Sequence, residues 1–135
     1  MTAQRAKYYR AIFLAATLYD VVLGLLFVFF YRHAFQWLGA QLPYSGAFIT
    51  LLGASAFVIG IAYFLVFLGD LQRNRDLIVI GTLYKAAYSG VSFYHLASGD
   101  IPHILFAALF GIIDVAFLVL FPECLFTLRR SRSRR

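Results

Sequence analysis

Charged residues are scarce in this chain of 135 residues. Asp, Glu, Lys and Arg together make up 13% of the sequence, about half the share that is usual in soluble proteins. Hydrophobic residues make up 62%, and the mean hydropathy is +0.80. A soluble domain of this size has too much surface to hide so much apolar area. The shortage of charge therefore argues against a soluble protein and indicates a membrane protein with one domain.

Cysteine and the common catalytic motifs are also nearly absent. Cys124 is the one cysteine, which excludes an intrachain disulfide and a cysteine metal cluster. The sequence has no Ser/His/Asp motif, no glycine-rich phosphate loop and no HExxH zinc motif. These absences argue against an enzyme and point to no catalytic residue, and they leave the cofactor unknown. A role as one subunit of a redox complex stays open.

Positive charge is gathered at a few places along the chain, which has a net charge of +6. Three basic residues precede the first apolar run, Arg73 and Arg75 lie near the middle, and the basic tail, residues 129–135, holds five arginines. Membrane topology predicts such flanking charge, and the tail also suits anionic lipid headgroups. Nucleic-acid binding is the less favoured interpretation, because no aromatic or folded nucleic-acid-binding element accompanies the tail.

Four apolar runs are each close to the roughly 20 residues that a bilayer-spanning helix needs. They cover residues 11–31, 46–68, 77–97 and 102–121. Helices are expected because lipid offers no partners to backbone groups, and the runs lack the alternation of a barrel strand. The sequence therefore predicts an all-α integral membrane protein, an antiparallel bundle of four transmembrane helices within residues 1–128.

The basic residues also predict how the bundle is oriented. The N-terminus, the loop between the second and third runs, and the C-terminus hold ten of the twelve Lys and Arg residues. The positive-inside rule puts both termini in the cytoplasm, which favours a multi-pass protein of a bacterial inner membrane. On the opposite side, the amphiphilic stretch RHAFQWLGAQLPYSG predicts a short interfacial helix, with Phe35, Trp37 and Leu38 dipping into lipid.

Three charged residues lie inside the predicted spans at a similar depth. Asp20, Lys85 and Asp114 each fall about 10 to 14 Å from the cytoplasmic end at ~1.5 Å per residue. Small residues flank each of them at helical spacing and let helices approach closely, so the three side chains are expected to pair inside the bundle. Two carboxylates beside one ammonium leave excess negative charge, which favours a shared or bound proton. Neighbouring hydroxyl groups extend this cluster: Tyr19, Tyr84, Tyr88 and Ser89.

Two roles are open for this buried polar cluster. In a structural role, the cluster would hold three helices together and specify their register. As a functional site, it would bind a proton, an ion or the polar group of a substrate, because charges inside a membrane are commonly functional. The second helix carries Gly46, Gly53 and Gly60 at seven-residue spacing, which predicts a packing surface.

A second group of polar residues lies near the outer ends of the predicted helices: His33, His95, His103 and Asp100. Histidine and carboxylate ligands suit zinc or copper. Their spacing matches no ligand motif, however, so interfacial histidines without a metal are the favoured interpretation.

Three segments carry a family resemblance: LYDVVLGLLFVFFY at 18–31, NRDLIVIGTLYKAAY at 74–88 and GIIDVAFLVLF at 111–121. In hydropathy and in a few polar positions, they resemble the small four-helix bacterial membrane proteins of DoxX-like shape. The resemblance implies the four-helix fold. Some members of that group are associated with quinone-linked redox chemistry, and many have no known activity. No functional residue is carried over from it.

The sequence favours an accessory or interaction protein whose buried Asp20, Lys85 and Asp114 fix the bundle. The alternative is a unit that binds or transports a proton-coupled or lipid-soluble, quinone-like ligand, or a membrane subunit of a redox complex. Membrane lipids are the expected partners, together with further copies of the chain or a larger membrane complex.

Overall fold

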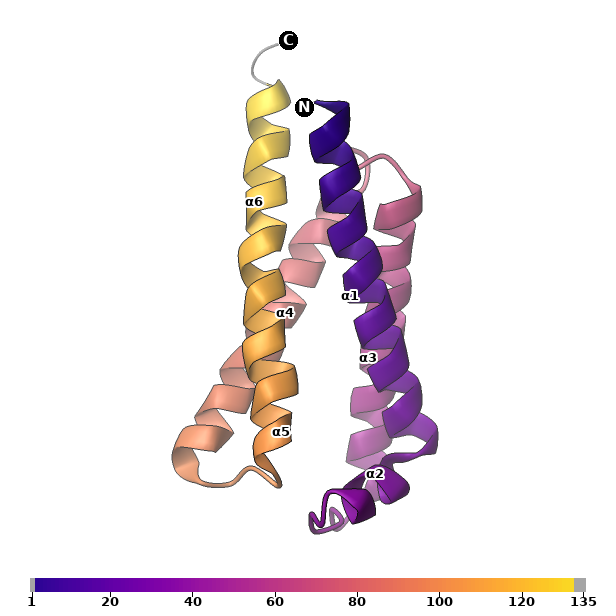
Figure 1. Ribbon diagram of the computed structural model, residues 1–135, viewed down its shortest axis with the longest axis vertical. Helices are drawn as coiled ribbons and strands as arrows, with labels where there is room; N and C mark the ends of the chain where they lie inside the picture. Colours follow the sequence, from indigo (N-terminus) through magenta and orange to yellow (C-terminus); the bar gives the residue numbers. More distant parts are fainter. Residues whose placement is uncertain (1, 133–135) are drawn as a thin grey trace.

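The computed structural model describes residues 2–132, and all of its regular elements are helical. Four long helical segments run antiparallel, and the first begins at the same end of the molecule at which the last one ends (Figure 1). The segments are α1 (Ala3–Phe29), α3 (Gly46–Leu68), α4 (Arg75–Ser98) and a last segment made of α5 (Ile104–Phe106), the π-helix η1 (Ala107–Ile113) and α6 (Asp114–Arg132); the short α2 (Tyr31–Trp37) follows α1.

Three of the long segments in the described range are long and apolar enough to cross a membrane: α1, α3 and Ile104–Ser131. The fourth, α4, falls below that measure. Its bounds lie close to the predicted span 77–97, so the helix itself was predicted correctly. Its composition does not by itself establish a crossing, because Lys85 is accompanied by hydroxyl-bearing residues such as Tyr84, Tyr88 and Ser89.

The ends of the other helices differ from the predicted spans for local reasons. Thr2 caps α1, since its side chain accepts a hydrogen bond from the Arg5 N–H at 3.4 Å, so this helix starts before residue 11. It ends at Phe29 because Phe30 leaves the helical region, with φ −126° and ψ 13°. The residues after it form the separate helix α2.

The last segment continues past residue 121, where the sequence predicted its end. Pro122 lies inside α6, and the helix runs on through residues 129–132 of the basic tail. Residues 133–135 of that tail lie outside the described residues. A proline inside a helix removes one backbone donor, but here the helix is continuous on both sides of it.

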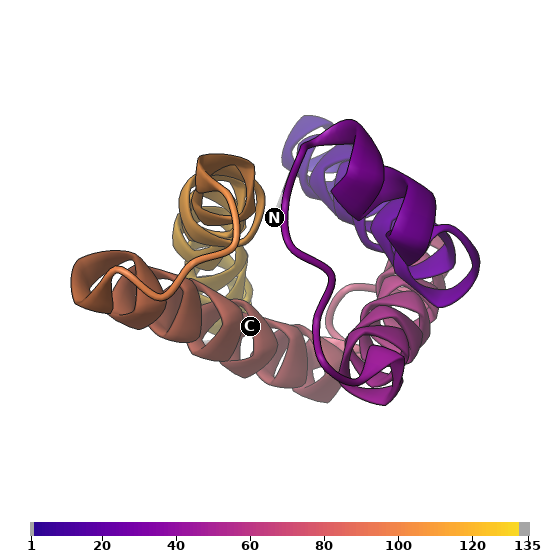
Figure 2. The same cartoon turned by 90° about the horizontal axis from the view of Figure 1, so that it is seen from below.

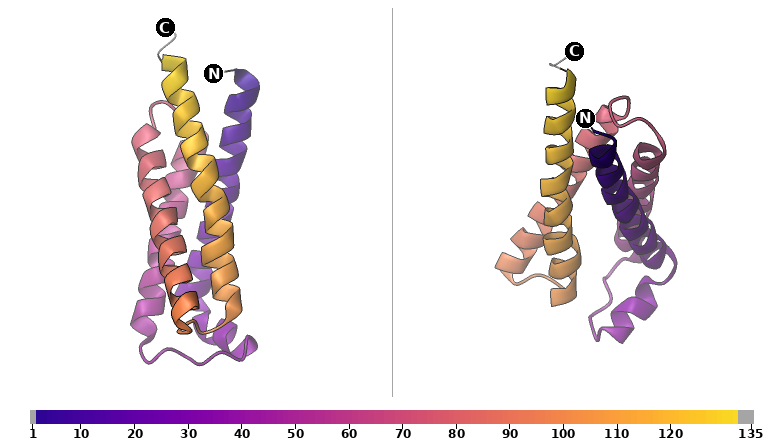
Figure 3. Two further views of the ribbon diagram at one scale, coloured as in Figure 1. Left: turned by 90° about the vertical axis from the view of Figure 1, so that its left-hand side faces the viewer. Right: turned by 45° about the horizontal axis from the view of Figure 1, so that its top comes forward.

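The long helices form two pairs, α1 with α3 and α4 with α6, as the three ribbon views show (Figures 1, 2 and 3). Glycines allow the closest approach between α1 and α3. A Cβ added to Gly24 would lie 2.7 Å from the Gly53 carbonyl oxygen, and a Cβ added to Gly53 would lie 2.8 Å from the Gly24 carbonyl oxygen. A Cβ added to Gly60 would lie 2.8 Å from Cγ2 and 3.0 Å from the nitrogen of Val21 on α1. The predicted glycine packing surface is therefore observed for Gly53 and Gly60, whereas Gly46 lies against the Tyr31 side chain of α2.

Two apolar cores fill the space between the helices. The inner core lies toward the end where α1 begins, and Tyr63, Phe13 and Phe121 are its largest fully buried members. The outer core lies toward α2 and consists of Leu23, Phe27, Phe35 and Phe110. Asp20 falls between the parts of α1 that supply the two cores, so the charged cluster lies between two apolar layers.

The predicted interfacial helix is present as α2, but its apolar residues are placed differently from the prediction. Phe35 is only 1% exposed and packs in the outer core, because the chain turns at Phe30 and α2 places the Phe35 ring 5.2 Å from the Phe106 ring, measured between centroids. Trp37 is 86% exposed. The prediction that Phe35 dips into lipid was therefore wrong, whereas Trp37 does lie on the surface.

Candidate functional site

Lys85 lies at the centre of a buried ion group with Asp20 and Asp114, which we call the charge triad. Its Nζ donates hydrogen bonds to both carboxylate oxygens of Asp20 and to Oδ1 of Asp114, each at 2.8 Å. The exposed fractions are 0% for Lys85, 3% for Asp20 and 1% for Asp114. An ammonium group has three donors, and here each one has a carboxylate acceptor. The triad is thus closed to solvent, and its lysine is fully satisfied.

The charge triad joins the two helix pairs. Asp20 belongs to α1 in one pair, whereas Lys85 and Asp114 belong to α4 and α6 in the other. Direct contacts between α1 and α6 are few compared with those inside each pair. The two salt bridges to Lys85 therefore supply a polar link where helix-to-helix packing is sparse.

Asp114 follows directly after the π-helix η1, an uncommon element that often marks a functional site in other proteins. Two carbonyl oxygens within η1 accept side-chain hydrogen bonds from neighbouring helices. Tyr19 Oη donates to the Leu109 oxygen at 2.6 Å, and Ser89 Oγ donates to the Gly111 oxygen at a long 3.5 Å. These two predicted cluster members therefore hold the backbone that presents Asp114, instead of binding the carboxylates.

Four aromatic rings surround the Lys85 ammonium. The distances from Nζ to the ring centroids are 5.1 Å for Tyr19, 5.3 Å for Phe117 and 5.7 Å for both Tyr63 and Tyr84. These fall within the ~6 Å over which a cation is attracted to a ring face. The ammonium therefore has favourable electrostatic neighbours beyond its two carboxylates.

Sequence reasoning missed two of these rings, Tyr63 and Phe117. Phe117 lies three residues after Asp114, which puts both on the same helix face. Tyr63 lies three residues after Gly60, at the end of the glycine packing surface, and its hydroxyl donates to the Gly81 oxygen at 3.2 Å. Both rings could have been found from the sequence by counting one helical turn from Asp114 and from Gly60.

Tyr84 and Tyr88 complete the predicted cluster. Their rings stack at a centroid distance of 4.3 Å. Tyr88 also contacts the Phe110 ring of the outer core at 5.9 Å. Together the two tyrosines connect the charge triad to the outer core by packing.

The histidines predicted as low-priority metal ligands are dispersed. His95 Nδ1 lies 3.4 Å from Asp100 Oδ2, and both side chains are exposed. His103 precedes α5, where its Nδ1 accepts a hydrogen bond from the Leu105 N–H at 3.2 Å. His33 lies on α2. Within residues 2–132, no three His, Cys, Asp or Glu side chains are close enough to hold a metal ion.

Comparison with protein-family models, with curated proteins and with solved structures found no match to this chain. The resemblance to DoxX-like proteins accordingly stays a prediction.

Proposed function

We propose that this chain is a four-helix integral membrane protein of a bacterial inner membrane, with both termini in the cytoplasm, and that it serves as an accessory or interaction protein. The proposal rests on the observation that the charge triad is closed to solvent. A transport or catalytic site has to be reached by its substrate, whereas Lys85 has no exposed surface and all its donors are bonded within the chain. Such a group suits a structural role, which we call the structural lock: the buried ions hold the helices in register.

The placement of polar groups on α4 supports its crossing of the membrane as the fourth span. Its 24 residues extend about 36 Å at 1.5 Å per residue, enough for a hydrocarbon core of roughly 30 Å. Lys85 and Ser89 are buried against the other helices, whereas large apolar side chains such as Ile80, Leu83 and Val91 are exposed. The helix thus presents apolar residues outward and offsets its one central charge with two carboxylates.

Cysteine labelling tests this topology. In a Cys124→Ser background, we expect a membrane-impermeant maleimide added to intact spheroplasts to label Gln41→Cys and Ser98→Cys. Gln72→Cys should be labelled only after lysis. All three positions are exposed, so access depends on the side of the membrane. If α4 does not cross, Ser98→Cys is protected together with Gln72→Cys, and the four-span topology is contradicted.

The accessory role predicts a stable assembly in the native membrane. We expect chemical cross-linking in intact membranes to give a discrete species larger than the 15.3 kDa chain. The same species should form when Asp20, Lys85 and Asp114 are replaced together by Asn, Met and Asn, because a buried lock does not touch the partner. Mass spectrometry of the species distinguishes further copies of this chain from another protein. A chain that stays monomeric under conditions that capture a known membrane complex would contradict the role.

The charge balance of the triad supports a second candidate, a proton-binding unit. Two carboxylates and one ammonium carry a net charge of −1 when all are ionised, so electrical neutrality in an apolar environment requires one bound proton. The same imbalance is compatible with the lock, since a proton held permanently between the carboxylates removes the excess charge. The absence of exposed surface at Lys85 favours the lock.

A further inference from the structure

Positive charge is concentrated at the end of the molecule where α1 begins and α6 ends (Figure 1). Among residues 2–131, this end holds seven Lys and Arg residues against three Asp and Glu residues. The seven are Arg5, Lys7, Arg10, Arg73, Arg75, Arg129 and Arg130. None of them forms a salt bridge within that range, where the paired cations are Lys85 and His95. The charge of this end is therefore available to an anionic partner.

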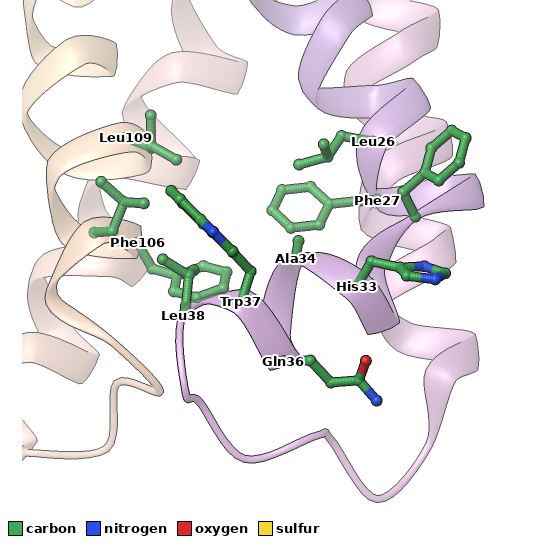
Figure 4. Close-up of a pocket in the computed structure, with 11 residues that line it drawn as sticks. Leu26, Phe27, His33, Ala34, Gln36, Trp37, Leu38, Phe106 and Leu109 are labelled. Atoms are coloured by element: carbon green, nitrogen blue, oxygen red, sulfur yellow. The ribbon is translucent and has the colours of Figure 1, made fainter.

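The opposite end of the molecule offers no comparable charge. Its Lys, Arg, Asp and Glu residues in the described range are Arg32 and Asp100. Figure 4 shows the pocket at that end, which measures about 720 Å³ and has the Phe27 and Phe106 rings among its lining side chains. No Asp, Glu, Lys or Arg lines this pocket, so it contains no partner for a charged group.

Two of the unpaired arginines face each other across the contact between α1 and α6. Tyr9 Oη donates a hydrogen bond to Glu123 Oε1 at 3.0 Å and lies 3.0 Å from Thr127 Oγ, which joins the two helices. Arg5 lies one turn before Tyr9, and Arg130 lies one turn after Thr127, on the same helix faces. Because α1 and α6 are antiparallel, both arginines lie at the same level, just outside this contact. We call Arg5 and Arg130 together the basic seam.

Exposed aromatic rings lie on the membrane side of these arginines. Phe126 is 65% exposed and lies four residues before Arg130, on the same side of α6. Tyr8 is 50% exposed and lies three residues after Arg5, one turn deeper along α1. A cation at the surface with an apolar ring beneath it matches a phospholipid, whose phosphate lies at headgroup level and whose chains lie below it.

The charge of the basic seam selects among phospholipids. A guanidinium group donates two parallel hydrogen bonds to a phosphate, so one phosphate between the two helices can bind both arginines. Two arginines that face each other repel, and an anion between them removes the repulsion. A zwitterionic headgroup brings an ammonium along with its phosphate, whereas an anionic headgroup does not. The seam therefore suits a lipid with net negative charge.

We propose that the basic seam binds an anionic phospholipid of the cytoplasmic leaflet, with the phosphate between Arg5 and Arg130 and an acyl chain beside Phe126. The lipid links α1 to α6, where direct helix packing is sparse. The proposal rests on the membrane location proposed above.

Native mass spectrometry of the protein in a mild detergent tests this binding directly, because each bound lipid adds its own mass. We expect the first dioleoylphosphatidylglycerol to bind with saturation, at a concentration at least fivefold lower than dioleoylphosphatidylcholine. The two lipids have the same chains, so the difference reports the headgroup. Glycerol 3-phosphate, which has no chains, should not displace the bound phosphatidylglycerol at the same concentration.

Two double variants separate the basic seam from the general charge of this end. Replacing both Arg5 and Arg130 by Gln is expected to raise the half-saturating concentration of phosphatidylglycerol at least tenfold. Replacing both Arg73 and Arg75 by Gln removes the same charge from the α3–α4 turn, away from the seam, and should raise it less than threefold. All four side chains are exposed, and circular dichroism checks that both variants are folded.

Four results would overturn the proposal. Equal binding of the two lipids would show no selection for negative charge, and equal effects of the two double variants would show only diffuse attraction. Displacement by glycerol 3-phosphate would make a free phosphate compound the ligand. An RNA oligonucleotide that binds at a lower concentration than phosphatidylglycerol would assign the arginines to nucleic acid. These results leave the membrane location intact, whereas a chain that stays soluble without detergent and binds neither lipid would overturn that location as well.

Discussion

Lys85→Met is expected to lower the free energy of unfolding by about 3 to 5 kcal/mol, the usual cost of breaking a buried ion group by removing one partner. The variant leaves the carboxylates of Asp20 and Asp114 facing each other with no cation between them. It also removes three hydrogen bonds and the attraction of the ammonium to four aromatic rings. The effect is measured by titrating purified protein from a mild detergent into sodium dodecyl sulfate and following helix content by circular dichroism.

Lys7→Met is the matched control for this experiment. Lys7 is exposed near the start of α1, so the same chemical change there removes no buried partner. We expect its effect on unfolding to stay within about 0.5 kcal/mol, as for other surface substitutions. Equal effects of the two variants would mean that the triad contributes nothing particular to stability.

Gly53→Ala is expected to cost about 1 to 3 kcal/mol, the usual range for overpacking a well-packed contact. The added Cβ would lie 2.8 Å from the Gly24 carbonyl oxygen and 2.9 Å from the Val28 nitrogen. Both are backbone atoms, so no side chain can rotate away, and α1 has to move from α3. The same detergent titration measures the loss.

Gly90→Ala separates this steric effect from the general preference of helices for alanine. Gly90 lies in α4 with nothing within 4 Å of its added Cβ. Alanine is favoured over glycine in a helix by about 1 kcal/mol, so we expect this variant to be as stable as the wild type or slightly more so. A Gly53→Ala variant that behaves like Gly90→Ala would contradict the close α1–α3 contact.

Much of the fold could be predicted from the distribution of apolar residues. The four long helices follow from the four apolar runs, and the second run matches α3 at both ends. The contact of Asp20, Lys85 and Asp114 follows from their common depth and their small neighbours. A buried charge in an apolar helix needs a partner at its own level, so the residue count along each helix, together with the small residues beside each charge, predicted that the three would pair.

Other features depend on tertiary packing and left no comparable signal. The π-helix η1 adds a residue to its turns, which no hydropathy pattern over residues 107–113 reveals. The turn at Phe30 places Phe35 in the outer core instead of in lipid. The sequence gives no sign of this, because the amphiphilic pattern of α2 suits either setting. A pocket at the end of the molecule opposite the termini is lined by residues of α1 and α2 and by residues of the α5–η1 segment, which lie far apart in the sequence, so its walls could not be recognised in advance.

The most direct test of the structural lock compares the wild type with the variant in which Asp20, Lys85 and Asp114 become Asn, Met and Asn. Removing all three charges leaves no unpaired ion, so we expect this variant to be more stable than Lys85→Met alone. It should stay less stable than the wild type, because the polar link between the two helix pairs is lost. A neutral variant that unfolds later than the wild type would contradict the lock. It would mean that the charges are kept at a cost to stability and that the proton-binding role is the one to pursue.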